Sequence, residues 1–362
     1  MQTASLTFDL IRPFLDRMIQ SGETPGLHYA CFSGSQILYQ YSAGMACLRS
    51  GDPMEPRHTL HWYSITKTFT ALAVLRLADQ GLLDLDGLAA SYLPDFPYPG
   101  PVTLRQLLTH RAGIPNPFPL NWIHPAAEHA RFDPDAFFAE VFRRHSRLHA
   151  RPGTRYAYSN LGYVLLGQIL ESVTRQPLET VIEQQVLRPA RLGPGSAGFA
   201  APDISRHACG YHRRNTLSYH LLGLLMRRSE VMDPQADGRW RAFRPAYVNG
   251  AAYGGLIGTA EALARYGQAL LQPSLAWLPP ASRRVLLGLD GQPALAWFSG
   301  QLRQQPYRAH AGGGGGYYGE IRLYPEAGIG TVILLNRSGL SDARLLDGPD
   351  LLTGIAGAPQ PV

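Results

Sequence analysis

A single lysine directs attention to one short stretch of the 362-residue chain, Ser64-Ile65-Thr66-Lys67. The chain contains 33 lysine and arginine residues, and Lys67 is the one lysine among them. Arginine keeps its charge in proteins, whereas a buried lysine can lose its proton near neutral pH. The choice of lysine at this position therefore indicates a site that needs an amine able to accept and release a proton.

The residues that follow Ser64 predict a buried helix. Segment 64–78 reads SITKTFTALAVLRLA, which is apolar nearly all round, and Gly81 follows as a C-cap. Residues three apart on a helix share a face, so the Lys67 amine is expected beside the Ser64 hydroxyl. At the helix N-terminus, free backbone N–H groups favour negative charge. A nucleophile, an adjacent base and an anion-stabilising helix end are the parts of an acyl-transfer site.

Two later stretches carry further candidate residues. Tyr158 and Asn160 precede a predicted helix over 161–174; a phenol beside a cation can carry a proton, and an amide can bond both Lys67 and a substrate carbonyl. The alternative is a buried tyrosine and a helix cap. His310-Ala311-Gly312 opens a run of five glycines, where a main-chain N–H could complete an oxyanion hole. The alternative there is a flexible loop.

The elements that must position these residues follow from the periodicity. We expect a hairpin of strands over 27–33 and 36–43, strands over 317–324 and 330–336, and a further strand over 307–310. Predicted helices cover 6–20, 64–78, 103–109, 133–147, 161–174, 178–187 and 259–271, with a last one inside 341–356. Segment 193–250 is expected to be irregular, with one helical stretch near 217–228. The order predicts an α+β fold: an antiparallel sheet domain from 1–85 and 250–362, flanked by helices, with a mostly helical domain inserted over 86–249.

Composition bears on the compartment. The chain has no run of 18 apolar residues, so no membrane span is expected, and its amphipathic first 20 residues are unlike a signal peptide. The three cysteines, Cys31, Cys47 and Cys209, are few and odd in number, which fits a reducing compartment. These features predict a cytoplasmic protein.

The charge balance and the motifs narrow the partners. The net charge is +6, but the arginines are spread along the chain without a zinc-finger or RNP motif, so nucleic acid is not expected. The densest basic segment, Arg206 to Arg244, is a solvated face or a docking surface for an acidic partner. No Walker A loop or G-x-S-x-G elbow is present, and no third ligand accompanies His145 and His149. Neither a metal nor a cofactor is expected.

Taken together, Ser-x-x-Lys at 64–67, Tyr-x-Asn at 158–160 and His-x-Gly at 310–312 resemble the serine β-lactamase and penicillin-binding-protein superfamily. The closest likeness is to its branch of class C β-lactamases, D-alanyl-D-alanine peptidases and related esterases, with supporting stretches at 104–114, 151–171 and 253–266. The resemblance implies that Ser64 is acylated, that Lys67 and Tyr158 handle its proton with either as the base, and that Asn160 supports them. It implies oxyanion donors at the N–H groups of Ser64 and Gly313.

The same resemblance contains one departure. His310-Ala311-Gly312 stands where the family usually has Lys-Thr-Gly, a carboxylate-binding device, and a neutral histidine grips an anion poorly. We therefore expect a serine hydrolase that forms an acyl-enzyme with a small ester, amide or thioester. The alternatives are an acyltransferase of secondary metabolism fed by an acidic carrier protein, a β-lactamase or D-alanyl-D-alanine carboxypeptidase, and a non-catalytic binding protein of the same fold.

Overall fold

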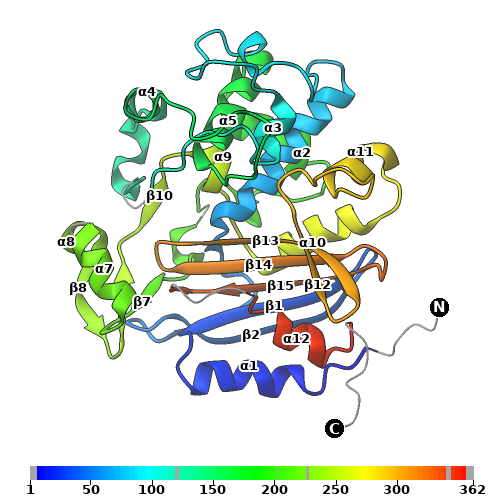
Figure 1. The fold of residues 1–362 in the computed structure, drawn as a ribbon. Coiled ribbons are helices and arrows are strands. Elements are labelled where there is room, and N and C mark those ends of the chain that lie inside the picture. The colour runs from blue at the N-terminus through cyan, green and yellow to red at the C-terminus, as the bar shows by residue number, and fades with distance from the viewer. Residues whose placement is uncertain (1–5, 119–121, 202, 226–227, 340–343, 356–362) are drawn as a thin grey trace.

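A seven-stranded antiparallel sheet forms the base of the computed structural model, which describes residues 6–118, 122–201, 203–225, 228–339 and 344–355 (Figure 1). The strand order is β12-β13-β14-β15-β1-β2-β3, so the N-terminal hairpin lies beside the C-terminal strands. The bounds are β1 Gly26–Ser33, β2 Ile37–Cys47, β3 Asp52–Pro53, β12 Phe298–Leu302, β13 Gln305–Gly314, β14 Tyr317–Tyr324 and β15 Ile329–Leu335. The expected sheet built from both chain ends is confirmed.

Strand β1 shows why both faces of this sheet are covered. Its side chains alternate: Leu27 and Tyr29 pack in the cluster that contains Ile11 of helix α1 (Ile11–Gln20). Phe32 belongs to the other cluster, with Phe69 of helix α2 (Thr66–Asp79). A strand buried on both sides is apolar at nearly every position, as this one is. Helices α1 and α12 (Asp347–Leu352) cover one face, and α10 (Ala260–Leu271) lies across the other (Figure 1).

The helices above the sheet surround α2 (Thr66–Asp79), whose side chains are buried from Thr66 to Leu75. Their bounds are α3 Leu104–Leu108, α4 Pro134–Arg144, α5 Asn160–Thr174, α6 Leu178–Ile182, α9 Ala251–Gly254 and α11 Pro280–Leu286. Asp133, Ser159 and Thr259 cap α4, α5 and α10 through their side-chain oxygens. Most of these helices match the sequence-based expectation within a few residues; α9, α11 and strand β12 were not predicted. The domain limits near 85 and 250 stay a prediction.

Segment 193–250 departs from the irregular structure expected for it. Strands β7 (Tyr211–Arg213), β8 (Met232–Asp237) and β9 (Trp240–Phe243) form a four-stranded sheet with β16 (Arg337–Ser338). Two further short strands of this segment pair with strands outside it. Strand β10 (Ala246–Val248) pairs with β5 (Ile123–Pro125), and β6 (Ala197–Gly198) pairs with β11 (Ile257–Gly258). Helices α7 (Leu217–Leu225) and α8 (Arg228–Val231) lie where one helical stretch was predicted. Strands this short, paired with residues far along the chain, leave no local alternation to read.

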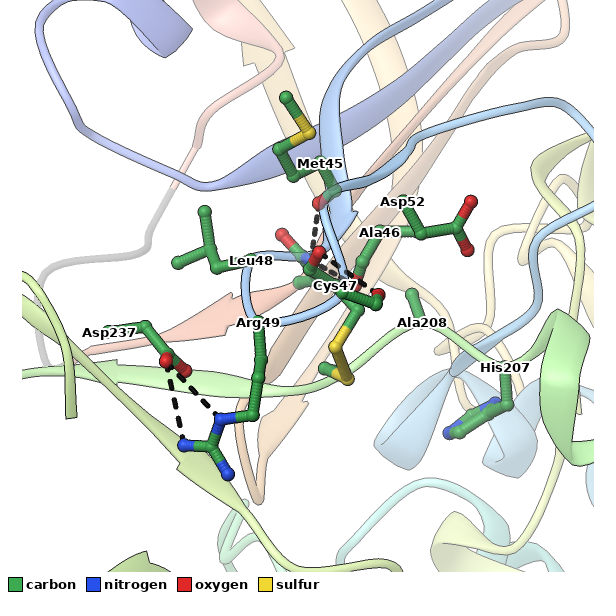
Figure 2. Close-up of a disulfide and its surroundings, with 12 residues drawn as sticks. Met45, Ala46, Cys47, Leu48, Arg49, Asp52, His207, Ala208 and Asp237 are labelled. Carbon is green, nitrogen blue, oxygen red and sulfur yellow. Dashed lines mark hydrogen bonds and ion pairs between the residues drawn. A yellow bond between two sulfur atoms is a disulfide. The ribbon is translucent and has the colours of Figure 1, made fainter. Parts of the chain in front are cut away.

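The structure contains a disulfide bond, which the expected reducing compartment would disfavour. Cys47, at the end of β2, is bonded to Cys209, which precedes β7, with the two Cα atoms 5.1 Å apart (Figure 2). Cys31 is buried and free. The odd number of cysteines therefore does not argue for a reducing compartment, because two of the three are joined. In the part of the chain that the structure describes, no helix has the length and apolar character needed to cross a membrane.

Candidate active site

Ser64 lies in a tight turn, Tyr63–Ile65, that leads directly into α2. Strand β4 (Leu60–His61) holds the approach by pairing with β11 (Ile257–Gly258), and the N–H of Trp62 donates to the carbonyl of Leu256 at 2.9 Å. Tyr63 has φ of 44°, a left-handed conformation that a bulky residue adopts only under constraint. This turn leaves Ser64 half-buried at the helix start, as the sequence predicts.

Lys67 and Ser64 meet as expected from their spacing. The Nζ atom of Lys67 is 3.0 Å from Ser64 Oγ and donates to the carbonyl of Tyr253 at 2.9 Å. The Lys67 side chain is fully buried. The rings of Tyr158, Tyr163 and Tyr253 surround the amine, with Nζ 5.0–5.6 Å from their centroids.

Burial lowers the pKa of the Lys67 amine well below its ordinary value of 10.5. The three tyrosine faces and the carbonyl act in the opposite direction, because they stabilise an ammonium group by about 0.5–2 kcal/mol per ring. Desolvation of a buried ion costs several kcal/mol, and no carboxylate contributes to this pKa to repay it. We conclude that burial wins and that the amine is neutral over a wide range of pH.

Tyr158 is the second partner of the serine. Its OH donates to Ser64 Oγ at 3.0 Å, and burial raises its pKa above the ordinary value of 10. The phenol is therefore protonated at neutral pH and can give a proton more readily than take one. With Tyr158 donating to Oγ, the serine proton is free to point at the neutral Lys67 amine.

His110, which the sequence-based interpretation quoted within 104–114 but did not assign, positions Tyr158. The two rings lie 4.3 Å apart, and His110 Nδ1 accepts the N–H of Ser159 at 3.2 Å. The carbonyl of His110 accepts the N–H of Ala157 at 2.7 Å. Its backbone is left-handed, with φ of 55°. Both residues flanking Tyr158 are thus tied to this one histidine.

Asn160 lies near these groups but does not make the expected bond to Lys67. Its Oδ1 is buried without a hydrogen-bond partner, and its N–H donates to Asn116 Oδ1 at 2.9 Å. The carbonyl of Tyr253 takes the place beside the amine that the sequence assigned to Asn160. Tyr253 belongs to the quoted stretch 253–266, but a backbone acceptor leaves no trace in a side-chain pattern. This Oδ1 has no partner but is enclosed by the protein, so it does not face a substrate in this structure.

Strand β13 brings the glycine run against the serine. A Cβ at Gly312 would meet the carbonyl oxygen of Trp62 and lie 2.8 Å from the backbone N of Ser64. The neighbouring strand β12 ends its pairing with β13 at Ala309, so the edge from His310 onward is not covered by that strand. Gly313, the next residue, is exposed. This edge therefore presents backbone groups next to Ser64, as expected.

His310 is buried and neutral. Burial lowers its pKa to about 3. Its Nδ1–H donates to the carbonyl of Ala311 at 2.8 Å, and its ring lies 5.1 Å from that of Phe298. The Nε2 atom is buried without a partner. The position that would hold a cation in the resembling enzymes holds an uncharged ring here.

The close approach of Gly312 gives a first prediction. Gly312→Ala should push β13 away from Ser64, because both atoms it would meet belong to the backbone and cannot rotate aside. A displacement of this kind costs about 100-fold in turnover at a reacting centre. The measurement is kcat/KM on an activated ester, with Gly193→Ala as the matched control, since nothing lies within 4 Å of that added carbon. Equal loss in both variants would contradict the assignment.

Comparison with known proteins identifies the family. The family model described as Beta-lactamase matches residues 9–354. Esterase EstB of Burkholderia gladioli is 30% identical over 342 residues, covering 83% of each chain. Penicillin-binding protein 4* of Bacillus subtilis is 28% identical over 182 residues, 49% of this chain and 40% of its own length. The octameric penicillin-binding protein homologue from Pyrococcus abyssi superposes with a TM-score of 0.78 at 23% identity, over 95% of this chain and 77% of that one.

The fold and the family match define the class: the protein is an enzyme of the serine hydrolase class. The chain belongs to the β-lactamase family. Among the described residues, no three His, Cys, Asp or Glu side chains cluster as ligands for a metal ion.

Proposed function

We propose that the protein hydrolyses small carboxylic esters or amides through an acyl-enzyme on Ser64. The observation that carries the proposal is the double contact of Ser64 Oγ, with Lys67 Nζ and Tyr158 OH each at 3.0 Å. One partner is a buried neutral amine and the other a protonated phenol, which is the pairing that a base and an acid need. The likeness to Esterase EstB supports an ester substrate.

The first half of the reaction forms the acyl-enzyme. Ser64 passes its proton to the neutral Lys67 amine while Oγ attacks the substrate carbonyl carbon. The N–H groups of Ser64 and Gly313 stabilise the resulting oxyanion. As the tetrahedral intermediate collapses, Tyr158 gives its proton to the leaving oxygen or nitrogen and takes one from the Lys67 ammonium. Lys67 is then neutral again.

The second half releases the acid. Water enters where the leaving group stood, and Lys67 takes its proton through Tyr158, so that hydroxide adds to the acyl carbonyl. Collapse of the second intermediate returns the proton to Ser64 Oγ and frees the carboxylic acid. Lys67 is the better candidate for the base. Its lowered pKa favours the neutral amine, which can accept a proton, whereas the raised pKa of Tyr158 keeps the phenol protonated.

The neutral His310 argues for uncharged acyl groups. A carboxylate beside the reacting carbonyl, as in β-lactams and peptide C-termini, would find an imidazole with a pKa of about 3 in place of a cation. We therefore rank β-lactam hydrolysis and carboxypeptidase activity below ester hydrolysis.

Acyl transfer from an acidic carrier protein stays the alternative. Within the basic segment 206–244, Arg206 and Arg244 are exposed, but Arg206 lies 3.5 Å from Asp203. The Arg241 side chain binds Tyr219 OH and the carbonyl of Asp233. Much of this charge is thus engaged within the chain. Binding of a carrier that weakens steeply with salt would favour transfer over hydrolysis.

A covalent probe tests the proposal directly. An ethyl fluorophosphonate should add one phosphonyl group to the protein, and peptide mass mapping should place it on Ser64. Excess p-nitrophenyl butyrate present during labelling should slow the addition. No adduct on Ser64, together with steady ester turnover in the labelled sample, would reject the mechanism.

A further inference from the structure

We infer that helix α7 (Leu217–Leu225) binds an anionic phospholipid surface, with its outward leucines at the boundary of headgroups and acyl chains and neighbouring arginines on the phosphates. The contact is peripheral, and it is independent of the chemistry proposed at Ser64. It follows from an apolar helix turned outward, from unpaired arginines beside its first turn, and from its place at the edge of the molecule.

Helix α7 exposes residues that a helix normally buries. Its sequence is LSYHLLGLL, in which five of nine residues are leucine. A helix this apolar is expected in a protein core or in a membrane. Yet Leu217 is 73% exposed, and Leu221, one helical turn later, is 39% exposed. Residues four apart lie on one face of a helix, so these two leucines form an apolar stripe that points outward.

The hydroxyl groups of α7 are turned toward the protein instead. Tyr219 is buried, and its OH accepts a hydrogen bond from Arg241 at 2.7 Å. Its ring lies 6.2 Å from the ring of His212, and Ser218 Oγ lies 3.0 Å from His212 Nε2. Rotating the helix to bury its leucines would break these bonds, and each broken bond leaves a polar group without its partner. The leucines are therefore held outward.

Three exposed arginines gather beside the first turn of α7. Arg213 and Arg214 precede the helix, and the N–H of Arg214 donates to the carbonyl of Arg239 at 2.8 Å, which brings the third arginine to them. Arg214 Nη1 lies 3.5 Å from the carbonyl of Gly238, and Arg239 Nη1 lies 3.3 Å from that of Ser21. Among the described residues, no carboxylate pairs with any of the three guanidinium groups.

The acidic side chains of the adjoining β8–β9 hairpin are already paired. Asp233 and Asp237 lie 2.5 Å and 3.5 Å from the guanidinium group of Arg49. The three arginines therefore leave positive charge next to the exposed Leu217. Each arginine near an anionic bilayer strengthens binding by about fivefold. Their long aliphatic stems allow the charged ends to reach phosphates while leucines enter the boundary below the headgroups.

A second copy of the chain fits this face less well. In a two-fold contact the same patch meets itself, so the three arginines of one copy would face those of the other. Like charges brought together in this way oppose association. An anionic lipid surface has no such conflict. Figure 1 shows α7 and α8 at the edge of the molecule, beyond the seven-stranded sheet, where a broad surface can reach the helix.

Sedimentation with lipid vesicles tests the inference. Phosphatidylcholine vesicles that contain about one third phosphatidylglycerol should bind the protein at least about tenfold more strongly than vesicles of phosphatidylcholine alone. Binding should weaken as salt is added, because ions screen the arginines. The double variant Leu217→Gln with Leu221→Gln should lower the affinity for the anionic vesicles at least about tenfold, and so should Arg213→Gln with Arg214→Gln.

Matched variants place the same changes elsewhere on the surface. Leu82 is 50% exposed and Arg147 is exposed, so Leu82→Gln and Arg147→Gln should leave vesicle binding unchanged. Circular dichroism of each variant reports its folding. A second measurement follows the helix itself: lipids brominated in their acyl chains should quench the added fluorescence of Leu217→Trp and leave that of Leu82→Trp unquenched.

Three results would overturn the lipid contact. The first is no sedimentation with the anionic vesicles at low salt, and the second is unchanged binding by the folded leucine double variant. The third is a dimer, seen by light scattering, that the leucine double variant dissociates, because a second copy would then cover this face. Labelling of Ser64 is measured without vesicles. Its success with no vesicle binding would leave the proposed hydrolysis standing alone, and its failure would leave the lipid contact standing.

Discussion

Ser64→Ala should lower kcat/KM for an activated ester by about 10³-fold or more while the protein remains folded. Removing a nucleophile of this kind leaves only the rate enhancement from binding and the oxyanion donors. Ser64 is half-buried and its hydroxyl bonds only to Lys67 and Tyr158 among the contacts of the described residues, so alanine fits the turn. Steady-state kinetics with p-nitrophenyl acetate, corrected for the uncatalysed rate, give the measurement.

A matched serine exists elsewhere in the chain. Ser91 is exposed, and Ser91→Ala should keep full turnover. The phosphonate adduct should disappear in Ser64→Ala and persist in Ser91→Ala. Turnover within tenfold of the parent protein in Ser64→Ala would mean that another group attacks the substrate.

Lys67→Arg should lose about 10²–10⁴-fold in kcat/KM, although it conserves the positive charge usually assigned to lysine. A guanidinium group holds its proton above pH 12, so it cannot accept one from Ser64. It would also place a permanent charge at a buried position where, among the described residues, no carboxylate pairs with the amine. Lys67→Met should be equally inactive but well folded, because it replaces a desolvated amine with a thioether of similar length.

The pH profile separates a base from a merely structural amine. The Lys67 pKa is lowered, so its reactive neutral form is present above that pKa, and kcat/KM of the parent protein should rise with pH and level off well below pH 10.5. Neither variant should show this rise. Because the unfolded chain keeps the lysine protonated up to about pH 10.5, the stability of the parent protein should also increase with pH above the folded-state pKa, and Lys67→Met should lose this dependence.

Arg105→Lys is the control for these measurements. It places a lysine at a partly exposed ion pair with Asp86, 2.7 Å apart, and Arg105 makes no contact with Ser64, Lys67 or Tyr158 among the hydrogen bonds and ion pairs of the described residues. Full activity is expected, since surface ion pairs contribute little to stability. A Lys67→Arg protein with more than a tenth of the parent activity would show that the amine is not the base.

The parts of the site that the sequence predicted are those encoded by residue type and short spacing. A three-residue interval on a helix brought Lys67 to Ser64 without any knowledge of the fold. The only lysine in an arginine-rich chain signalled a proton-transfer role before any partner was known. The sheet was equally accessible, because β1, β14 and β15 are rich in apolar and aromatic residues and lie between clear turns.

Other parts depend on contacts between residues far apart, which leave no local pattern. Tyr253 contributes a carbonyl to Lys67 across 186 positions, and any residue type could supply that atom. The bond from Asn160 to Lys67 was a reasonable expectation from side-chain chemistry, and the backbone acceptor took its place. The Cys47–Cys209 bond spans 162 positions, so an odd cysteine count could not reveal it.

The burial of Lys67 has a practical consequence for the surface. Since this fully enclosed side chain is the one ε-amino group in the sequence, succinimidyl dyes, aldehyde-activated resins and glutaraldehyde have no lysine to attack while the fold is intact. The other fixed positive charges are arginine guanidinium groups, so a reagent selective for arginine would modify many side chains at once.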